Sequence, residues 1–241
     1  MRIICSTSNN YLHILPIFCY LFNNFWSQKQ DVTIIGYNHP NYNLPDNFDF
    51  VSLNDGDQQT KNDYARHLRE YLESIDDNYF IYTMEDTFIK NNINFESLND
   101  LISICNDTNN IGRIDLTEGI LNRSFSIFDK VNNTTIIESD QYAEYRISCQ
   151  MSIWNKKYIL KYLKDGYSPW DFEIKGSSLA KNDGYKILGT LKENLVVPKN
   201  EGCRVDETTL STHSPIPKKI YNLDDIDENL IKDMIKKNIL T

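Results

Sequence analysis

Two acidic residues directly follow an apolar run of six residues, Tyr79 to Met84. Glu85 and Asp86 stand where such a strand would end, and ligands of open α/β sheets bind beyond the carboxyl ends of the strands. Carboxylate oxygens are ligands for Mg²⁺ or Mn²⁺, ions that bridge the phosphates of a diphosphate. An ordinary acidic turn is the alternative, and the motif alone favours neither interpretation.

A second candidate is the segment from Tyr145 to Trp154, whose alternation predicts one long strand. One face would be core. The other face would carry hydrogen-bonding groups and an aromatic ring, namely Arg146, Ser148, Gln150, Ser152 and Trp154. Such a row suits a hydroxyl-rich ligand, and a solvent-facing side of a sheet is the alternative.

A third candidate is Ser168 to Glu173 (SPWDFE), at the expected start of a helix. Asp171 and Glu173 lie two positions apart, so at most one of them faces a given cleft. Apolar neighbours would raise the pKa of a carboxylate here and suit it to act as a general base. Acids that complement the helix dipole are the alternative.

Weaker candidates complete the set of residues that could do chemistry. Arg66 could reach a phosphate, although a surface arginine is the more frequent case. Arg113 and Asp115 alternate along one expected strand and could pair with each other. His213 is a metal ligand or has no role, since the four histidines show no HxH or HExxH spacing.

Length, composition and charge limit the class of protein. The chain has 241 residues, 40% hydrophobic and 24% charged, which is typical of a soluble globular domain. Its net charge of −9 disfavours binding to nucleic acid or to anionic membranes, because such proteins are normally basic. Five widely spaced cysteines without a CxxC pair predict reduced thiols in a cytosol-like compartment, without disulfides or a zinc site.

Strands and helices must position these residues. Apolar runs predict strands at 2–6, 31–37, 48–53, 79–84 and 111–116, with helices at 11–28, 60–75 and 95–105 between them. This order predicts an α/β fold with a mostly parallel central sheet flanked by helices. Residues 11–26 are apolar but shorter than the ~20 residues of a membrane-spanning helix, so we expect a buried helix and no membrane span.

The second part of the chain has a different pattern. It predicts a hairpin at 124–130 and 134–138, the strand at 145–154, and helices at 156–164 and 169–181, the latter capped by Ser168. Short strands follow at 185–188 and 194–197, then a loop at 200–217 and a helix at 227–238. No P-loop or GxGxxG motif occurs, so ATP-type and nicotinamide-type sites lose their usual support.

Three segments together resemble a known enzyme family: 79–89 (YFIYTMEDTFI), 145–154 (YRISCQMSIW) and 168–177 (SPWDFEIKGS). Their order and spacing resemble small GT-A-type glycosyltransferases encoded by large DNA viruses, phages and bacterial polysaccharide loci. The resemblance covers about residues 1–200. It implies a single GT-A-like domain over 1–241, with a Rossmann-like nucleotide-sugar-binding half at about 1–116, an acceptor half at about 117–200, and a C-terminal loop and helix at 201–241.

The resemblance also implies an activity. A hexosyl or deoxyhexosyl group would move from a UDP-, GDP- or dTDP-linked donor to a hydroxyl of a glycan or glycoconjugate. The location would be cytoplasmic, in the host if the chain is viral. The usual D-x-D motif is replaced here by Glu85-Asp86-Thr87.

Residue roles follow from the same resemblance. Asp86 would be the principal contact for Mn²⁺ or Mg²⁺, with Glu85 assisting and contacting the donor. Asp171 or Glu173 would be the base, with Glu173 slightly favoured. The donor would lie against Ser6, Thr7, Ser8, Tyr37, Asn38 and Arg66, the last as pyrophosphate partner, and the sugar and acceptor against Arg146, Gln150, Trp154 and Trp170.

Two other classes stay open at this point. A sugar nucleotidyltransferase would share a related core, but the loop Ser6 to Asn10 lacks the glycine and basic residues usual there. A catalytically inactive carbohydrate- or nucleotide-sugar-binding relative is the other, since the third acid of the D-x-D motif is missing.

Overall fold

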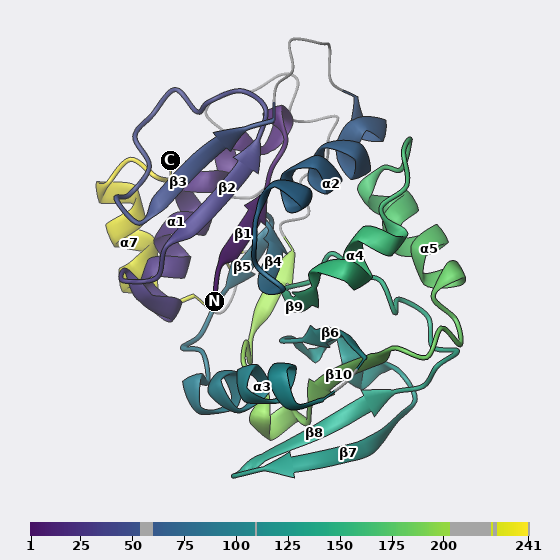
Figure 1. Ribbon diagram of the computed structural model, residues 1–241. Coiled ribbons are helices and arrows are strands. Elements are labelled where there is room, and N and C mark those ends of the chain that lie inside the picture. Colours follow the sequence, from purple (N-terminus) through teal and green to yellow (C-terminus); the bar gives the residue numbers. More distant parts are fainter. Residues whose placement is uncertain (54–59, 109, 203–222, 224–225, 241) are drawn as a thin grey trace.

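The computed structural model describes residues 1–53, 60–108, 110–202, 223 and 226–240. One nine-stranded sheet runs through it in the order β3-β2-β1-β4-β9-β6-β10-β8-β7 (Figure 1). Its strands are β1 (Ile3–Ser6), β2 (Val32–Gly36), β3 (Phe48–Ser52), β4 (Tyr79–Met84), β6 (Ile111–Asp115), β7 (Phe125–Val131), β8 (Thr134–Ser139), β9 (Ser152–Asn155) and β10 (Lys186–Thr190).

Most of these strands run in one direction. The pairs β3–β2, β2–β1, β1–β4 and β6–β10 are parallel. Only β9 and β8 run against their neighbours within the described sheet. The predicted α/β class with a mostly parallel central sheet is therefore confirmed. A small antiparallel sheet pairs β5 (Thr87–Ile89) with β11 (Asn200–Gly202).

Helices cover both faces of the sheet. On one face lie α1 (Leu15–Phe22), α3 (Phe95–Asp107) and α7 (Glu228–Lys236), which share a hydrophobic core with β1, β2 and β4. On the other lie α2 (Tyr64–Ser74), α4 (Lys156–Tyr162) and α5 (Pro169–Leu179) (Figure 1). Neighbouring strand residues such as Ile3 and Ile4 enter opposite cores, because successive strand side chains point to opposite faces.

Local sequence signals explain where helices α2 and α5 begin. Thr60 and Asp63 form a capping box ahead of α2, and Ser168 and Asp171 form one at α5. Each box satisfies backbone N–H groups that have no partner within the helix. Pro169 occupies the first turn of α5, where its missing N–H does no harm. The predicted cap Ser168 is thus confirmed.

The predicted helix at 11–28 is interrupted. A 3₁₀ segment, η1 (Asn9–Ile14), precedes α1, and a π-helical segment, η2 (Asn23–Ser27), follows it. Pro16 lies in the first turn of α1. Because proline cannot donate a backbone hydrogen bond inside a helix, the regular α-helix begins at this point. Within the described residues no helix combines the length and apolarity needed to cross a bilayer.

The predicted strand at 145–154 is wrong for most of its length. Only β9, from Ser152, is a strand, and residues 145–151 form a loop. Tyr145 has a φ of 52°, which lies outside the β region. Ser152 pairs with both Tyr82 and Asp115, the end of β6 and nearly the end of β4, so few partners remain beyond it.

Other predicted boundaries differ near the C-terminus. The predicted strand at 194–197 is absent, and a 3₁₀ turn, η5 (Lys192–Asn194), comes before it. Val197 instead donates one backbone hydrogen bond to Leu116. The predicted loop at 200–217 begins with β11. His213 and Cys203 lie outside the described residues.

Candidate functional site

The loops that follow β1 and β4 lie side by side at the carboxyl edge of the sheet. Ser6 pairs with Met84 in the parallel register, and the Ser6 carbonyl accepts a hydrogen bond from the Glu85 amide at 3.2 Å. The Thr7 amide donates to Ile35 of β2 at 2.9 Å. The fold thereby brings the predicted donor loop, Ser6 to Ser8, against the predicted metal-binding acids.

Glu85 is a carboxylic acid inside the protein, with only 2% of its surface exposed. Burial raises the pKa of Glu85 well above its usual range, and the charge of Asp86 adds to the rise. Hydrogen bonds from the Thr7 hydroxyl and the Ser8 backbone oppose it. Among the described residues, the Oε2 atom of Glu85 is buried and has no hydrogen-bond partner, a costly arrangement unless another group binds it.

Asp86 is half-buried beside Glu85. Burial raises the pKa of Asp86 to about 6, and a hydrogen bond from its own backbone opposes the rise. The charge of Glu173 raises it further. Glu173 therefore lies within electrostatic reach of Asp86, although 87 positions separate them in the sequence. The charge of Glu173 is thus coupled to the acidic pair that follows β4.

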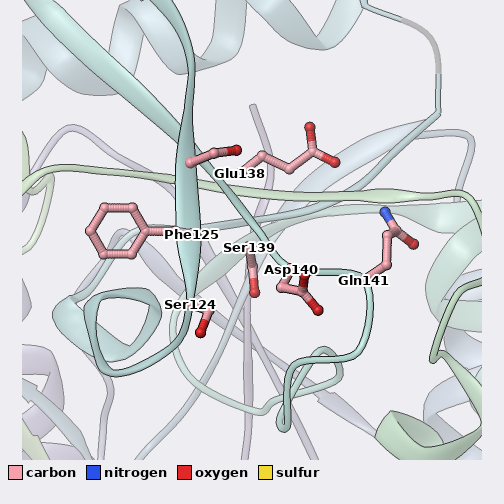
Figure 2. Close-up of a pocket in the computed structure, with 7 residues that line it drawn as sticks. Ser124, Phe125, Glu138, Ser139, Asp140 and Gln141 are labelled. Carbon is pink, nitrogen blue, oxygen red and sulfur yellow. The ribbon is translucent and has the colours of Figure 1, made fainter.

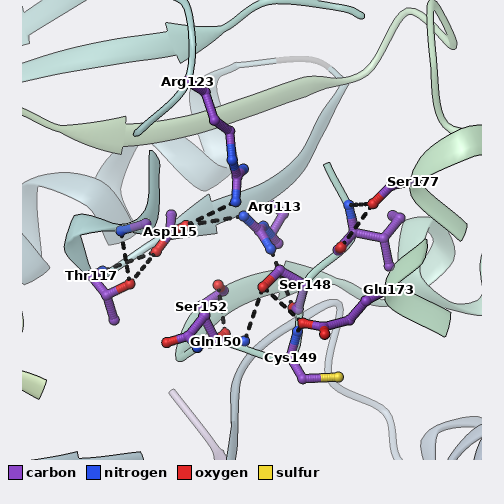
Figure 3. A network of polar contacts seen from close by, with 12 residues as sticks. Arg113, Asp115, Thr117, Arg123, Ser148, Cys149, Gln150, Ser152, Glu173 and Ser177 are labelled. Carbon is purple, nitrogen blue, oxygen red and sulfur yellow. Dashed lines mark hydrogen bonds and ion pairs between the residues drawn. The ribbon is translucent and has the colours of Figure 1, made fainter. Parts of the chain in front are cut away.

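The two acids of α5 have different surroundings. Oε1 of Glu173 accepts hydrogen bonds from the Ser148 hydroxyl at 3.1 Å and the Cys149 amide at 2.7 Å (Figure 3). Asp171 instead accepts from the Ser168 hydroxyl at 2.7 Å and pairs with Lys175 at 2.7 Å. As predicted from their spacing, the two side chains engage different neighbours.

The expected rise in the pKa of an acid at this helix start is wrong for Asp171. The Lys175 ammonium, followed by the Ser168 hydroxyl and amide, lowers the pKa of Asp171 to about 2. These donors stabilise the ionised form. A carboxylate held in this way is a weak base.

Two predicted sugar-binding residues, Arg146 and Trp154, lie in the interior instead. Both side chains are 0% exposed, so neither offers a surface to a ligand. Arg146 donates to the carbonyls of Ala180 at 2.8 Å and Tyr185 at 2.6 Å. Trp154 stacks on Tyr158. The physical reasons differ. Arg146 lies in the loop that replaces most of the predicted strand, whereas Trp154 stays in β9 and is buried because α4 and α5 cover its face of the sheet.

Gln150 and Trp170, the other two predicted acceptor contacts, are accessible. Gln150 is exposed and its Oε1 accepts a hydrogen bond from Asn200 of β11 at 3.3 Å. Trp170 is 54% exposed at the first turn of α5, three residues before Glu173. Both remain available to a ligand that approaches Glu173.

The remaining donor-binding candidates follow β2 or lie on α2. The Asn38 amide donates to the Asn9 side chain at 2.9 Å, which ties the loop after β2 to the loop after β1. The Tyr37 hydroxyl lies 3.2 Å from Nδ1 of His67. Arg66 pairs with its helix neighbours Asp63 at 3.2 Å and Glu70 at 3.6 Å, and such pairs partly neutralise its charge.

A buried ionic cluster extends the site at the end of β6. Arg113 and Asp115 pair at 3.0 Å with both side chains 0% exposed, as their alternation suggested. Arg123, which the sequence did not single out, lies 4.0 Å from Asp115 (Figure 3). Burial and Arg113 lower the pKa of Arg123 to about 10, and Asp115 and Glu173 oppose this. The position of Asp115 at a strand end was the available signal, whereas Arg123 had none.

Metal binding is compatible with the two acids after β4. Within the described residues, no three His, Cys, Asp or Glu side chains form a ready metal cage. Mg²⁺ is commonly held by one or two carboxylates together with substrate phosphates. Asp86 and the unpartnered Oε2 of Glu85 supply two such carboxylates, so the residues fit a cation that arrives with a diphosphate.

Two surface hollows lie away from these acids. One, of about 360 Å³, is lined by residues 124–126 at the start of β7 and 138–141 at the end of β8 (Figure 2). The other, of about 340 Å³, lies between α1 and α7. Neither is lined by Glu85, Asp86 or Glu173, so the candidate site rests on the chemistry of its residues.

Comparisons with known proteins show likeness in structure only. The sequence matches no protein-family model and no curated protein. It is similar in structure to a cytidylyltransferase from Leptospira borgpetersenii, with 12% identity and a TM-score of 0.47 over 99% of this chain and 95% of that one. The galactosyltransferase LgtC, in complex with donor and acceptor sugar analogues, gives 13% identity and a TM-score of 0.38 over 77% and 67%. Likenesses below a TM-score of 0.5 do not decide an activity, which must be inferred from the site residues.

Proposed function

We propose that this protein is a glycosyltransferase that moves a sugar from a nucleotide-diphosphate donor to a hydroxyl group of a glycan acceptor. The observation that carries the proposal is the position of Glu85 and Asp86 at the carboxyl edge of the sheet, beside the loop Ser6 to Ser8 and within electrostatic reach of Glu173. Two acids suit a metal-bound diphosphate, and the third suits a proton acceptor.

Asp86 and Glu85 would hold Mn²⁺ or Mg²⁺, which would neutralise the charge that develops on the departing diphosphate. The raised pKa values of both acids support this role, because a cation relieves the repulsion between buried carboxylates. The loop Ser6 to Ser8, with Tyr37 and Asn38 next to it, would contact the nucleoside. Arg66 would contact the diphosphate from α2.

Glu173 would take the proton from the acceptor hydroxyl as the new glycosidic bond forms. Its carboxylate is fixed by Ser148 and Cys149, which favours a defined orientation towards the acceptor. Asp171 is occupied by its cap and by Lys175, so Glu173 is the better candidate of the two. Trp170 and Gln150 would form the surface on which the acceptor sugar lies.

The experiment is a thermal-shift screen against UDP-, GDP- and dTDP-sugars with and without Mn²⁺, followed by an assay of nucleotide release. We expect one class of sugar nucleotide to stabilise the protein in a metal-dependent way and to be slowly hydrolysed. Asp86→Ala should lose that response, and Asp171→Asn serves as the control that keeps it. No response to any sugar nucleotide, with a folded protein, would refute the proposal.

Pyrophosphate formation distinguishes the nearest alternative. A sugar nucleotidyltransferase would instead respond to a nucleoside triphosphate together with a sugar phosphate, and would release pyrophosphate. Adding CTP, UTP or dTTP together with a sugar phosphate, and measuring pyrophosphate release beside nucleotide release, therefore separates the two reactions.

A further inference from the structure

Arg113 and Asp115 form an ion pair in the interior of the protein. Both side chains are completely buried, and Nη2 of Arg113 lies 3.0 Å from Oδ2 of Asp115. Removing two charges from water costs several kcal/mol per ion, and apolar residues at such positions often stabilise a protein as well or better. A role in positioning other groups would account for the pair.

The pair is connected to Glu173 through a single loop. Nη1 of Arg113 donates to the Ser148 carbonyl at 3.2 Å. The Ser148 hydroxyl and the next amide, of Cys149, both donate to Oε1 of Glu173. Because a guanidinium group is planar and rigid, fixing one edge on Asp115 also fixes the loop carbonyl bound at the other.

Asp115 is itself held in place. Its Oδ1 accepts hydrogen bonds from the Thr117 amide at 3.0 Å and the Thr117 hydroxyl at 2.8 Å. The guanidinium of Arg113 lies 5.6 Å from the ring centre of Trp154, a cation–π contact that favours one position of the group. Trp154 thus packs against the Arg113 guanidinium in the interior instead of contacting a sugar.

The loop needs such an anchor because it has no regular structure. Residues 145–151 pair with no strand. Arg146 fixes the start of the loop through Ala180 and Tyr185, and Arg113 fixes its centre. The Ser177 hydroxyl of α5 also accepts from the Ile147 amide at 3.0 Å and donates to its carbonyl at 2.9 Å. Two buried arginines and Ser177 therefore hold the loop that carries the donors to Glu173, as Figure 3 shows for Arg113 and Ser177.

We propose that Arg113 and Asp115 are positioning residues that orient Glu173 for proton transfer. Both hydrogen bonds end on Oε1, so Oε2 is the oxygen left to take the proton. In the step itself the acceptor O–H bond breaks, its proton moves to Glu173, and the acceptor oxygen bonds to the anomeric carbon as the diphosphate leaves. This inference rests on the proposed function and adds two residues to it.

Two conservative variants test the proposal. Arg113→Lys keeps the charge, but an ammonium group cannot replace the planar guanidinium that donates to both Asp115 and the Ser148 carbonyl. Ser148→Ala removes one donor to Glu173 and leaves the backbone intact. Asp100→Asn is the matched control, because Asp100 is also a buried acid, bound to Thr134 at 2.6 Å, but lies on α3 across the sheet from α5.

The first readout is nucleotide release from whichever UDP-, GDP- or dTDP-sugar the wild-type protein turns over fastest. We expect kcat to fall about 10-fold in Ser148→Ala and about 100-fold in Arg113→Lys, since small misplacements of a reacting group have effects of this size. Donor affinity by calorimetry should stay within about twofold. In the Glu173→Gln background Arg113→Lys should cause no further loss. An equal loss in that background, or an equal loss in Asp100→Asn, would overturn the proposal.

The second readout does not depend on activity. Urea unfolding of Arg113→Lys, Glu173→Gln and the double variant should give non-additive shifts of the midpoint, because the contact between Arg113 and the Ser148 carbonyl holds the loop whose donors bind Glu173. Additive shifts would overturn the contact on which the inference depends. If no sugar nucleotide is turned over but the shifts are non-additive, the proposed function fails while the positioning of Glu173 stands.

Discussion

Removing the charge of Asp86 should stabilise the metal-free protein at neutral pH. Burial and Glu173 raise the pKa of Asp86 from 3.8 to about 6. A pKa that is higher in the folded state means that ionisation opposes folding, so stability is greatest below pH 4 and falls as the pH rises towards 6. The difference between 3.8 and about 6 corresponds to about 3 kcal/mol.

Asp86→Asn keeps the size of the side chain and removes the loss of stability that ionisation of Asp86 causes. Above pH 6 we expect the variant to exceed the wild type by up to about 3 kcal/mol, or roughly 6–12 °C in Tm for a domain of this size. Below pH 4 the two proteins should be equally stable. The gain comes with a loss of function, because the variant should no longer respond to Mn²⁺ with a sugar nucleotide.

Urea unfolding with EDTA at pH 4, 5, 6 and 7.5 measures the effect. The control is Asp171→Asn, whose wild-type carboxyl has a pKa lowered to about 2 by Lys175 and Ser168. The contribution of Asp171 to stability depends on pH in the opposite direction. The ionised carboxylate stabilises the folded protein above pH 4, and this stabilisation is lost as the pH falls through 2. A pH-independent difference between Asp86→Asn and wild type, or a less stable variant at pH 7.5, would refute the reasoning.

Three further predictions concern the base, the acceptor surface and the core. Glu173→Gln should lower turnover by about 10²–10⁴-fold while Asp171→Asn retains most of it, as measured by nucleotide release; equal rates in both would place the base elsewhere. Trp170→Ala should raise KM for a glycan acceptor and leave the urea midpoint unchanged, because the ring is 54% exposed. Gly112→Ala should destabilise the protein by about 1–3 kcal/mol in the same unfolding assay. The reason is that a Cβ at this position would lie 2.6 Å from the Tyr158 ring. An unchanged midpoint would show that the ring can move aside.

The order of elements could be predicted because hydrophobic periodicity is a local property. The run Tyr79 to Met84 and the amphipathic segment that became α2 are found close to their expected bounds. The cap Ser168 was also predictable, since capping depends on residues three positions apart. The two acids after β4 were predicted at a ligand-binding edge because that edge follows from parallel strand order.

The loop at 145–151 shows where local pattern is insufficient. Its alternation suits a strand, but a strand also needs neighbours with unpaired backbone groups. The first residue of β9, Ser152, lies opposite the last residue of β6, and β4 extends only two residues beyond it. The segment therefore leaves the sheet, and Arg146 turns inward to bind carbonyl groups from distant parts of the chain. No feature within the ten residues could show this.

The sequence by itself determined the α/β class, the acids at the end of β4 and the spacing that separates Asp171 from Glu173. Only the tertiary structure decided that Glu173 lies near Asp86 and that Arg123 joins Arg113 at Asp115. The physical reason is the sequence distance over which each kind of interaction acts. Periodicity and capping act over a few residues, whereas burial, charge coupling and the pairing of arginines with carboxylates depend on which distant segments the sheet brings together.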